Sequence, residues 1–450
     1  MPRLTHDRTT WFAYAQLGLW GFFLYGFGPV VPLLRDEQGT SAAVAGLHST
    51  GIAVGALLGG ALFAPAARRL GRGPAIWLGL AGVAAGVAAL GLLRPLPATL
   101  AVVALIATFG MMVISGVSVV LTAHHGPAAP AALTEANAAC AGMGILAPLV
   151  IGATVDAGHG WRPVMAVEVG LIALVALAAL AFRVRLPNGA PCDNSSSARL
   201  TPRSDLEPSA AAAAAEPVAV TASATAEAAG GAPVGSPAPA RDGLAGTGAP
   251  SGGPAGTRAS DRLPATYWIA WVLMSVTGSI EVCLSLWAAD VLRTHAGLGA
   301  GGASAAIAAI VCGMFVGRVA GGRFALRWPP VPLLLAALAV SLVGFTLFWA
   351  APVGWLAVTG LVVLGLGNAL HYPLAISIAL AVAGPAADKA AGWASYSMGV
   401  GFGIAPVVLG WVADGVGPHL AFLLLPGFIV AAVLLTVRLG RALRAPRPAV

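Results

Sequence analysis

Long apolar stretches dominate this 450-residue chain and limit what it can fold into. Most are about 20 residues long, enough for an α-helix to cross the ~30 Å hydrocarbon layer of a membrane. A backbone in lipid must satisfy its own hydrogen bonds, so each stretch is predicted to be a helix, since none shows the alternating polarity of barrel strands. The twelve predicted helices are Trp11–Leu34, Ala42–Pro65, Pro74–Leu93, Ala98–Ala123, Ala136–Val155, Trp161–Phe182, Thr266–Ala289, Ala300–Ala325, Val331–Ala350, Val353–Ala379, Ala390–Ala413 and His419–Val437.

Composition excludes several other classes of protein. Hydrophobic residues make up 58% of the chain and charged residues only 9%, too little charge to cover a soluble surface of this size. The net charge of +7 comes from arginines in short segments between apolar stretches, so it indicates topology and not nucleic-acid binding. The four cysteines have neither zinc-site nor disulfide-framework spacing. We therefore expect no metal and no cofactor.

One segment differs from the rest of the chain. Residues 186–263 are rich in Ala, Pro, Gly, Ser and Thr and cannot bury a core, so we expect a disordered linker. It separates a first six-helix bundle, residues 1–185, from a second, residues 264–450. The predicted fold class is an all-α membrane protein with two six-helix bundles.

The placement of basic residues predicts the orientation in the membrane. Of the 24 Lys and Arg residues, one set of alternate loops holds only Arg35, Arg94, Arg162 and Arg293. The positive-inside rule assigns the richer set, which includes both chain ends and the linker, to the cytoplasm. We expect a multi-pass protein of the cell membrane, a lipid-embedded monomer with both termini cytoplasmic.

The two halves of the chain repeat one another. The second and eighth predicted helices share a G-x3-G-x3-GG pattern, and the fifth and eleventh share Ala-Pro followed by Gly and Asp. Glycines every fourth residue lie on one helix face and let another helix approach closely. The residues predicted to pack helices or act as bending points are Gly55, Gly59, Pro148, Gly152, Gly317, Gly321, Pro406 and Gly410. The correspondence indicates a parallel duplication of a six-helix unit.

These patterns resemble the major facilitator superfamily. The segment Arg68-Arg69-Leu70-Gly71-Arg72-Gly73 is similar to the family's inner-loop motif, with its core at Gly71 and Arg72 and its acidic position at Arg68. A second-half counterpart includes Arg318 and Arg323. The resemblance implies a gating role for these loops, although the arginine at position 68 departs from the charge pairing usual in the family.

The fifth predicted helix carries a second resemblance. The run from Gly144 through Ala147-Pro148 to Gly152 is similar to a motif of the family's exporters, although Ala147 replaces its central glycine. The resemblance favours export over uptake. It also implies a small-molecule substrate and alternating access between two bundles.

Glu281 is the clearest candidate for coupling transport to a proton gradient. It lies well inside the seventh predicted helix, with Thr277 and Ser285 one turn away on either side. An ionised carboxylate is costly in a membrane interior, so Glu281 is expected to exchange a proton during transport. The alternative is a protonated or arginine-paired glutamate that only holds helices together.

Further polar residues fall on helices that, in the resembled family, surround the central cavity. The expected substrate-cavity residues are Tyr25, Ser115, Ser118, Ser285, Asn368, His371 and Tyr372. The chain has no phosphate-binding glycine loop and no nucleophile–base set, so neither ATP use nor an enzyme is predicted.

The leading hypothesis is a proton-coupled secondary transporter of a small organic molecule. An importer or uniporter without proton coupling is the alternative within transport. A membrane sensor that does not transport, and acts through the linker, is the alternative from another class.

Overall fold

The computed structural model describes residues 5–183, 263–325, 327–383 and 387–444, and within them it is helical with no strand. Twelve helical segments are long and apolar enough to cross a membrane. The helices are α1 (Arg8–Gln38), α2 (Ala42–Leu70), α3 (Arg72–Leu92), α4 (Leu96–His125), α5 (Ala129–Asp156), α6 (Arg162–Ala181), α8 (Ala265–Thr294), α9 (Ala300–Ala325), α10 (Pro330–Trp349), α11 (Gly354–Asn368), α12 (His371–Ala383), α13 (Ala387–Val416), α14 (Pro418–Ala421) and α15 (Leu424–Arg444), with a short 3-10 turn at Gly126–Ala128. The predicted all-α membrane fold is confirmed. The predicted linker, residues 186–263, lies outside the described residues except for its last position.

Local chemistry explains where the first helices begin and end. The Asp7 carboxylate accepts a hydrogen bond from the Thr10 amide (2.9 Å) and caps α1. Burial acts to raise the pKa of Asp7, but hydrogen bonds from Thr10 and the charge of His124 outweigh it, and the pKa lies below its usual value. Gly71 alone connects α2 to α3, and its φ of 92° is strained for residues with a side chain. The glycine of the inner-loop motif therefore makes a one-residue turn.

Glycines let helices pack closely within each half. A methyl group on Gly55 or Gly59 of α2 would lie 2.1 Å from a backbone oxygen of α4. In the second half, Gly313 and Gly317 of α9 lie similarly close to α11. The second helix of each half thus packs on the fourth, and the repeated glycines lie at this close contact, although the glycine pattern did not identify the partner helix.

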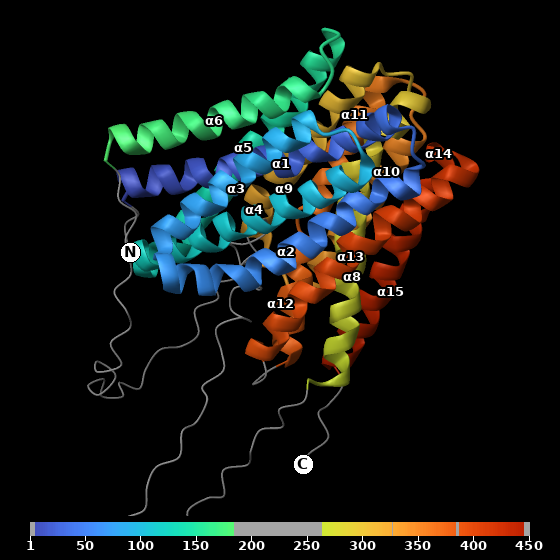
Figure 1. Ribbon diagram of the computed structural model, residues 1–450. Helices are drawn as coiled ribbons and strands as arrows, with labels where there is room; N and C mark the ends of the chain where they lie inside the picture. The colour runs from blue at the N-terminus through green and yellow to red at the C-terminus, as the bar shows by residue number, and fades with distance from the viewer. Residues whose placement is uncertain (1–4, 184–262, 326, 384–386, 445–450) are drawn as a thin grey trace, which may run out of the picture.

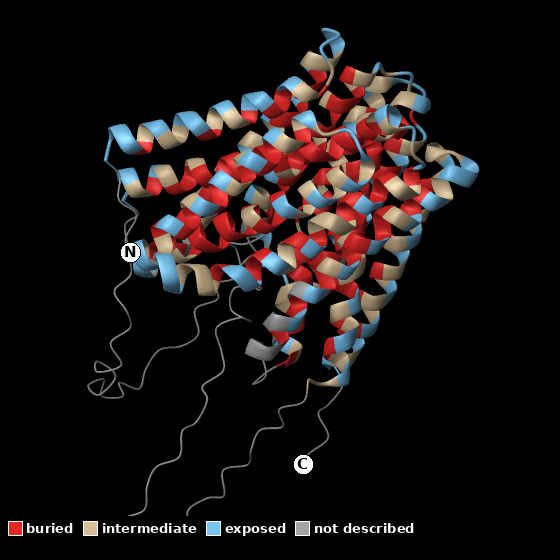
Figure 2. Cartoon of the chain, viewed as in Figure 1, coloured by how far each residue is buried: buried red, intermediate tan, exposed pale blue. Residues whose placement is uncertain are grey.

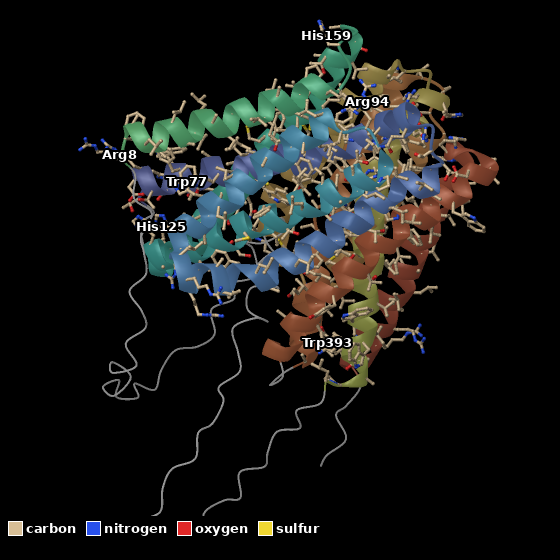
Figure 3. The ribbon with its side chains drawn as sticks, in the orientation of Figure 1. Arg8, Trp77, Arg94, His125, His159 and Trp393 are labelled. Atoms are coloured by element: carbon tan, nitrogen blue, oxygen red, sulfur yellow. The ribbon has the colours of Figure 1, made fainter. Side chains whose placement is uncertain are left out.

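The outer surface is apolar, as a lipid-facing surface must be. Leu174, Leu177 and Leu180 of α6 are 62%, 64% and 74% exposed, and exposed residues line the outer face of that helix in Figure 2. Charged and polar side chains gather at the two ends of the molecule, with Arg8 and His125 at one end and Arg94 and His159 at the other (Figure 3). Large apolar patches of this kind indicate contact with lipid.

The tenth membrane segment differs from its prediction as one helix, Val353–Ala379. It consists of α11 and α12, which are separated at Ala369 and Leu370. Pro373 lies in the first turn of α12, where its missing amide hydrogen costs least. The apolar stretch is continuous, so hydropathy alone did not reveal the break.

The two bundles meet at one end of the molecule and diverge at the other. We call the end where α1 begins and α15 finishes the proximal end, and the opposite end the distal end. Figure 1 shows α1 to α6 running toward the proximal end in one direction and α8, α12, α13 and α15 in another. Contacts between the bundles, described below, join α2 to α13, α5 to α9 and α1 to α8. The molecule is therefore closed at the distal end and open at the proximal end.

Candidate functional site

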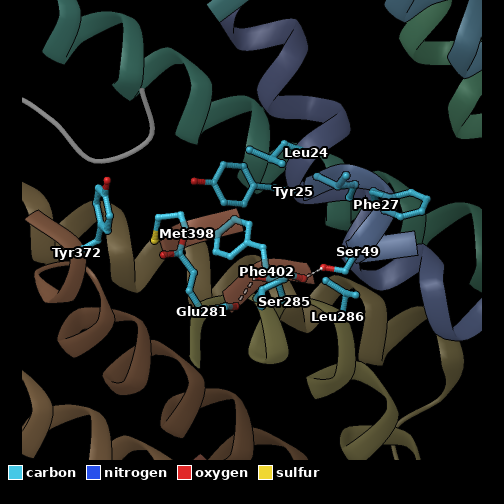
Figure 4. A pocket seen from close by; sticks show the side chains of 13 residues that line it. Leu24, Tyr25, Phe27, Ser49, Glu281, Ser285, Leu286, Tyr372, Met398 and Phe402 are labelled. Atoms are coloured by element: carbon cyan, nitrogen blue, oxygen red, sulfur yellow. Dashed lines mark hydrogen bonds between the residues drawn. The ribbon is translucent and has the colours of Figure 1, made fainter. Parts of the chain in front are cut away.

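A cavity lies where the two bundles face each other. Its walls come from α1 and α2 of the first bundle and from α8, α12 and α13 of the second. Figure 4 shows its polar residues: Tyr25, Ser49, Glu281, Ser285 and Tyr372. Apolar and aromatic side chains, among them Phe27, Met398 and Phe402, complete the wall. A mostly apolar cavity with a few converging polar groups is typical of a small-molecule site.

Four of the predicted cavity and coupling residues come together here. Tyr25 is supplied by α1, Glu281 and Ser285 by α8, and Tyr372 by α12. The Ser285 hydroxyl donates to the Glu281 backbone oxygen (3.0 Å), which leaves the carboxyl group of Glu281 for other partners. The predicted residues therefore form one site across the bundle interface.

Arg318 of α9 is not among the residues that line the cavity. Its buried Nε has no hydrogen-bond partner among the described residues. The role predicted for Arg318 in the inner-loop motif remains a prediction.

The structure places four other predicted cavity residues elsewhere. The His371 ring lies 3.1 Å from the Ser341 hydroxyl of α10 and is 1% exposed. The Asn368 amide faces the sulfur of Met314 (3.9 Å). Ser115 and Ser118 are buried on α4 outside the cavity wall described above. None of these four residues lines the cavity between the two bundles.

The inner-loop residues lie at the proximal end, away from the cavity. Arg68 is exposed in the last turn of α2, and Arg72 begins α3. Arg323 belongs to α9, and its side chain lies outside the described part of the chain. Their predicted gating role remains a prediction.

Pro406 creates a link between the bundles that the sequence did not reveal. Because proline has no amide hydrogen, the carbonyl of Phe402, four residues earlier in α13, lacks its helical donor. The Ser49 hydroxyl of α2 donates to that carbonyl (2.5 Å), and the Thr50 hydroxyl donates to the next one, Gly403 (2.5 Å). Pro406 thus leaves a backbone acceptor in α13 free for a donor from the opposite bundle.

Charged groups close the distal end. Arg35 of α1 pairs with Asp290 of α8, whose side chain is 3% exposed. Arg293 of α8 pairs in return with Asp36 of α1 (2.8 Å). The Asp414 carboxylate of α13 accepts hydrogen bonds from the first two amides of α2, which caps that helix across the interface.

Two predicted glycines permit close contact at the same end. A methyl group on Gly152 of α5 would lie 2.6 Å from the Gly301 oxygen of α9. One on Gly410 of α13 would lie 2.5 Å from the Ala42 oxygen of α2. The two contacts are equivalent in the repeated halves, so the distal closure follows the internal symmetry.

Comparisons with known proteins agree on one family. A model described as Major Facilitator Superfamily matches residues 17–386. No curated protein matches the chain.

Solved structures of transporters share the fold at low sequence identity. A mutant of the nucleoside transporter NupG is 13% identical, with a TM-score of 0.68 and coverage of 96% of this chain and 98% of that one. A bacterial homologue of the human lysosomal transporter Spinster, inward-facing and unoccupied, is 15% identical, with a TM-score of 0.67 and 98% coverage of both chains. A mutant of the E. coli fucose:proton symporter FucP is 16% identical, with a TM-score of 0.52 and coverage of 96% and 98%.

Proposed function

This chain belongs to the major facilitator superfamily, and on that premise we propose that it is a proton-coupled secondary transporter of a small organic molecule. The family consists of transporters, so the chain is not an enzyme. The observation that carries the proposal is the position of Glu281 in a cavity between the two bundles. A carboxyl group there can take up a proton when the cavity opens to one side and release it when the cavity opens to the other.

The contacts between the bundles support alternating access. The distal end is held by ion pairs, helix caps and backbone contacts, all of which can break without unfolding either bundle. With both termini in the cytoplasm, as the basic residues predict, the cavity faces inward. Rocking of the bundles would open the distal end and close the proximal one.

Proton coupling is supported by chemistry and by analogy. Glu281 lines the cavity, so its carboxyl group can gain and lose a proton where a transported molecule would bind. One structural neighbour, FucP, is by name a proton symporter. The proposal extends that type of coupling to this chain.

Replacing Glu281 with glutamine tests the proposal. The purified variant should fold and insert, because glutamine resembles the protonated side chain, but it should lose accumulation driven by a pH gradient. The measurement is uptake into proteoliposomes from a panel of hydrophilic organic acids, their amides and small amines, with and without an imposed gradient. Arg94→Gln, an exposed change at the distal end, is the control. Accumulation by the Glu281 variant at the wild-type level would refute the proposed coupling.

A further inference from the structure

A groove runs along the outer side of the first bundle, where α6 lies beside α1 and α5. Its walls are apolar along most of their length, with Gly18 and Leu19 from α1, Met143 from α5 and Leu174 from α6. Its volume of about 500 Å³ is within the range of ligand sites. We call it the α6 groove, and it shares no lining residue with the central cavity.

The α6 groove has the length and the position of a lipid chain. On α1 it is lined from Trp11 to Leu19, a rise of about 12 Å, which is most of the ~15 Å thickness of one leaflet. Trp11 and Leu174 are 59% and 62% exposed, so the groove opens sideways to the surrounding lipid. Tryptophan is enriched at the level of the lipid headgroups, and Trp11 lies at the proximal end of the groove.

Polar and charged groups gather at the same end of the groove. Glu135 lines it, and its Oε2 accepts a hydrogen bond from the Tyr14 hydroxyl (3.1 Å) and lies 2.6 Å from His6 Nε2. Both of these contacts with described residues end on Oε2, which leaves Oε1 of Glu135 for a ligand. The Arg8 guanidinium lies 5.9 Å from the ring centre of Phe182, beside the end of α6 (Figure 3). The mouth of the groove therefore presents a carboxylate and a guanidinium.

This pair of charges matches a zwitterionic headgroup that carries a primary amine. A phosphate is attracted to Arg8, and an ammonium group donates hydrogen bonds to Glu135. A primary ammonium has three N–H donors, whereas a choline headgroup carries the same charge with none. A headgroup with a phosphate and no amine would bring only negative charge to Glu135. Among common phospholipids, phosphatidylethanolamine fits both groups.

The internal repeat shows how the equivalent place in the second bundle is closed. Gly21 meets Cys140 in the first bundle as Gly278 meets Met398 in the second, which aligns α1 with α8 and α5 with α13. In this alignment the corresponding residues are Tyr14 and Trp271, Glu135 and Trp393, and Ala138 and Tyr396.

Aromatic side chains pack together at these second-bundle positions. The ring centres of Trp393 and Tyr396 are 5.5 Å apart, and those of Trp268 and Trp393 are 5.6 Å apart. The Trp271 indole donates a hydrogen bond to the Trp393 backbone oxygen (2.8 Å). Smaller side chains and a carboxylate at the corresponding positions leave the first bundle with a groove.

From these observations we propose that the α6 groove binds one phosphatidylethanolamine molecule, with an acyl chain along the groove and the headgroup between Glu135 and Arg8. The ammonium group donates to Glu135, and the phosphate faces Arg8. The lipid completes the wall of the first bundle at the place where aromatic side chains complete the second. This inference goes beyond the proposed function, since it holds whatever molecule the chain transports.

Lipids that differ only in methylation of the headgroup amine test the proposal. The melting temperature of the purified, delipidated protein is measured while phosphatidylethanolamine, its monomethyl and dimethyl derivatives, or phosphatidylcholine is added, all with the same acyl chains. The charge stays constant while the N–H donors fall stepwise from three to none. Phosphatidylethanolamine should stabilise at a concentration roughly tenfold lower than phosphatidylcholine, with the derivatives between them. Equal effects of the four lipids would overturn the headgroup site.

Two variants separate the headgroup from the acyl chain. Glu135→Gln should lose most of the preference for phosphatidylethanolamine over phosphatidylcholine, because the charge that attracts the ammonium group is gone. Ala138→Tyr copies the second bundle and fills the groove, so native mass spectrometry should find one fewer retained phosphatidylethanolamine than in the wild type. Ala173→Tyr, an exposed change on α6 outside the groove, is the matched control. A Glu135→Gln protein with the wild-type preference would refute the inference, even if Ala138→Tyr does not fold.

Discussion

Ser49 links the two bundles through a single hydroxyl group. In the structure it replaces the helical donor that Pro406 cannot supply to the Phe402 carbonyl. Ser49→Ala would leave that carbonyl without this donor when the distal end is closed, whereas water can solvate it when that end is open. We expect the variant to shift the balance toward the distal-open state by about 1 kcal/mol, roughly fivefold.

The shift can be measured as the fraction of distal-open molecules, from distances between spin labels placed across the distal end. Ser304→Ala is the matched control, because the Ser304 hydroxyl bonds only within its own helix, to the Ala300 oxygen (2.8 Å). Equal effects of the two substitutions would show that the Ser49 hydrogen bond to Phe402 does not stabilise the distal-closed state.

Single residues also mark how far the sequence could predict the site. Glu281 was predictable because a charge inside an apolar stretch is costly and therefore rare. The sequence placed Arg318 in the eighth helix but could not show that its Nε would be buried without a partner among the described residues, since that depends on how the other helices pack around it. His371 was misleading for the same reason: its Nε2 lies beside the Ser341 hydroxyl of α10, away from the cavity.

Close packing of α2 on α4 depends on glycine. A methyl group at Gly55 would lie 2.1 Å from the Ala104 oxygen, so Gly55→Ala must push the helices apart. We expect a loss of about 1–3 kcal/mol and a lower melting temperature of the purified protein. At Gly170 of α6 a methyl group meets nothing, so Gly170→Ala should be neutral or stabilising. If the Gly55 and Gly170 variants had the same melting temperature, the close contact of α2 with α4 at Gly55 would be contradicted.

Elements were more predictable than their contacts. Hydropathy identified each membrane segment, because a helix must bury about 20 apolar residues to cross lipid. The glycine pattern identified helix faces that pack closely, and the repeat indicated equivalent faces in the two halves. It did not predict that Gly152 and Gly410 would pack between bundles while Gly55 and Gly317 pack within them. That distinction requires the position of each helix in the bundle.

The whole molecule combines a closed distal end with separated proximal ends (Figure 1). Asp290 is almost fully buried beside Arg35, so the closed end depends on their charges remaining paired. Removing one partner leaves the other charge unpaired and poorly hydrated. An unpaired charge costs far less free energy once that end opens to water. Arg35→Gln should therefore favour the opposite arrangement of the bundles.

Spin-label distances at both ends test most directly whether the bundles exchange the end at which they close. With the four native cysteines replaced by alanine, one label pair would occupy positions 69 and 327 at the proximal end, and another positions 159 and 355 at the distal end. From wild type to Arg35→Gln, the proximal distance should shorten while the distal distance lengthens, and Arg94→Gln should change neither. Distances that stay fixed, or that change in the same direction at both ends, would contradict alternating access by this chain.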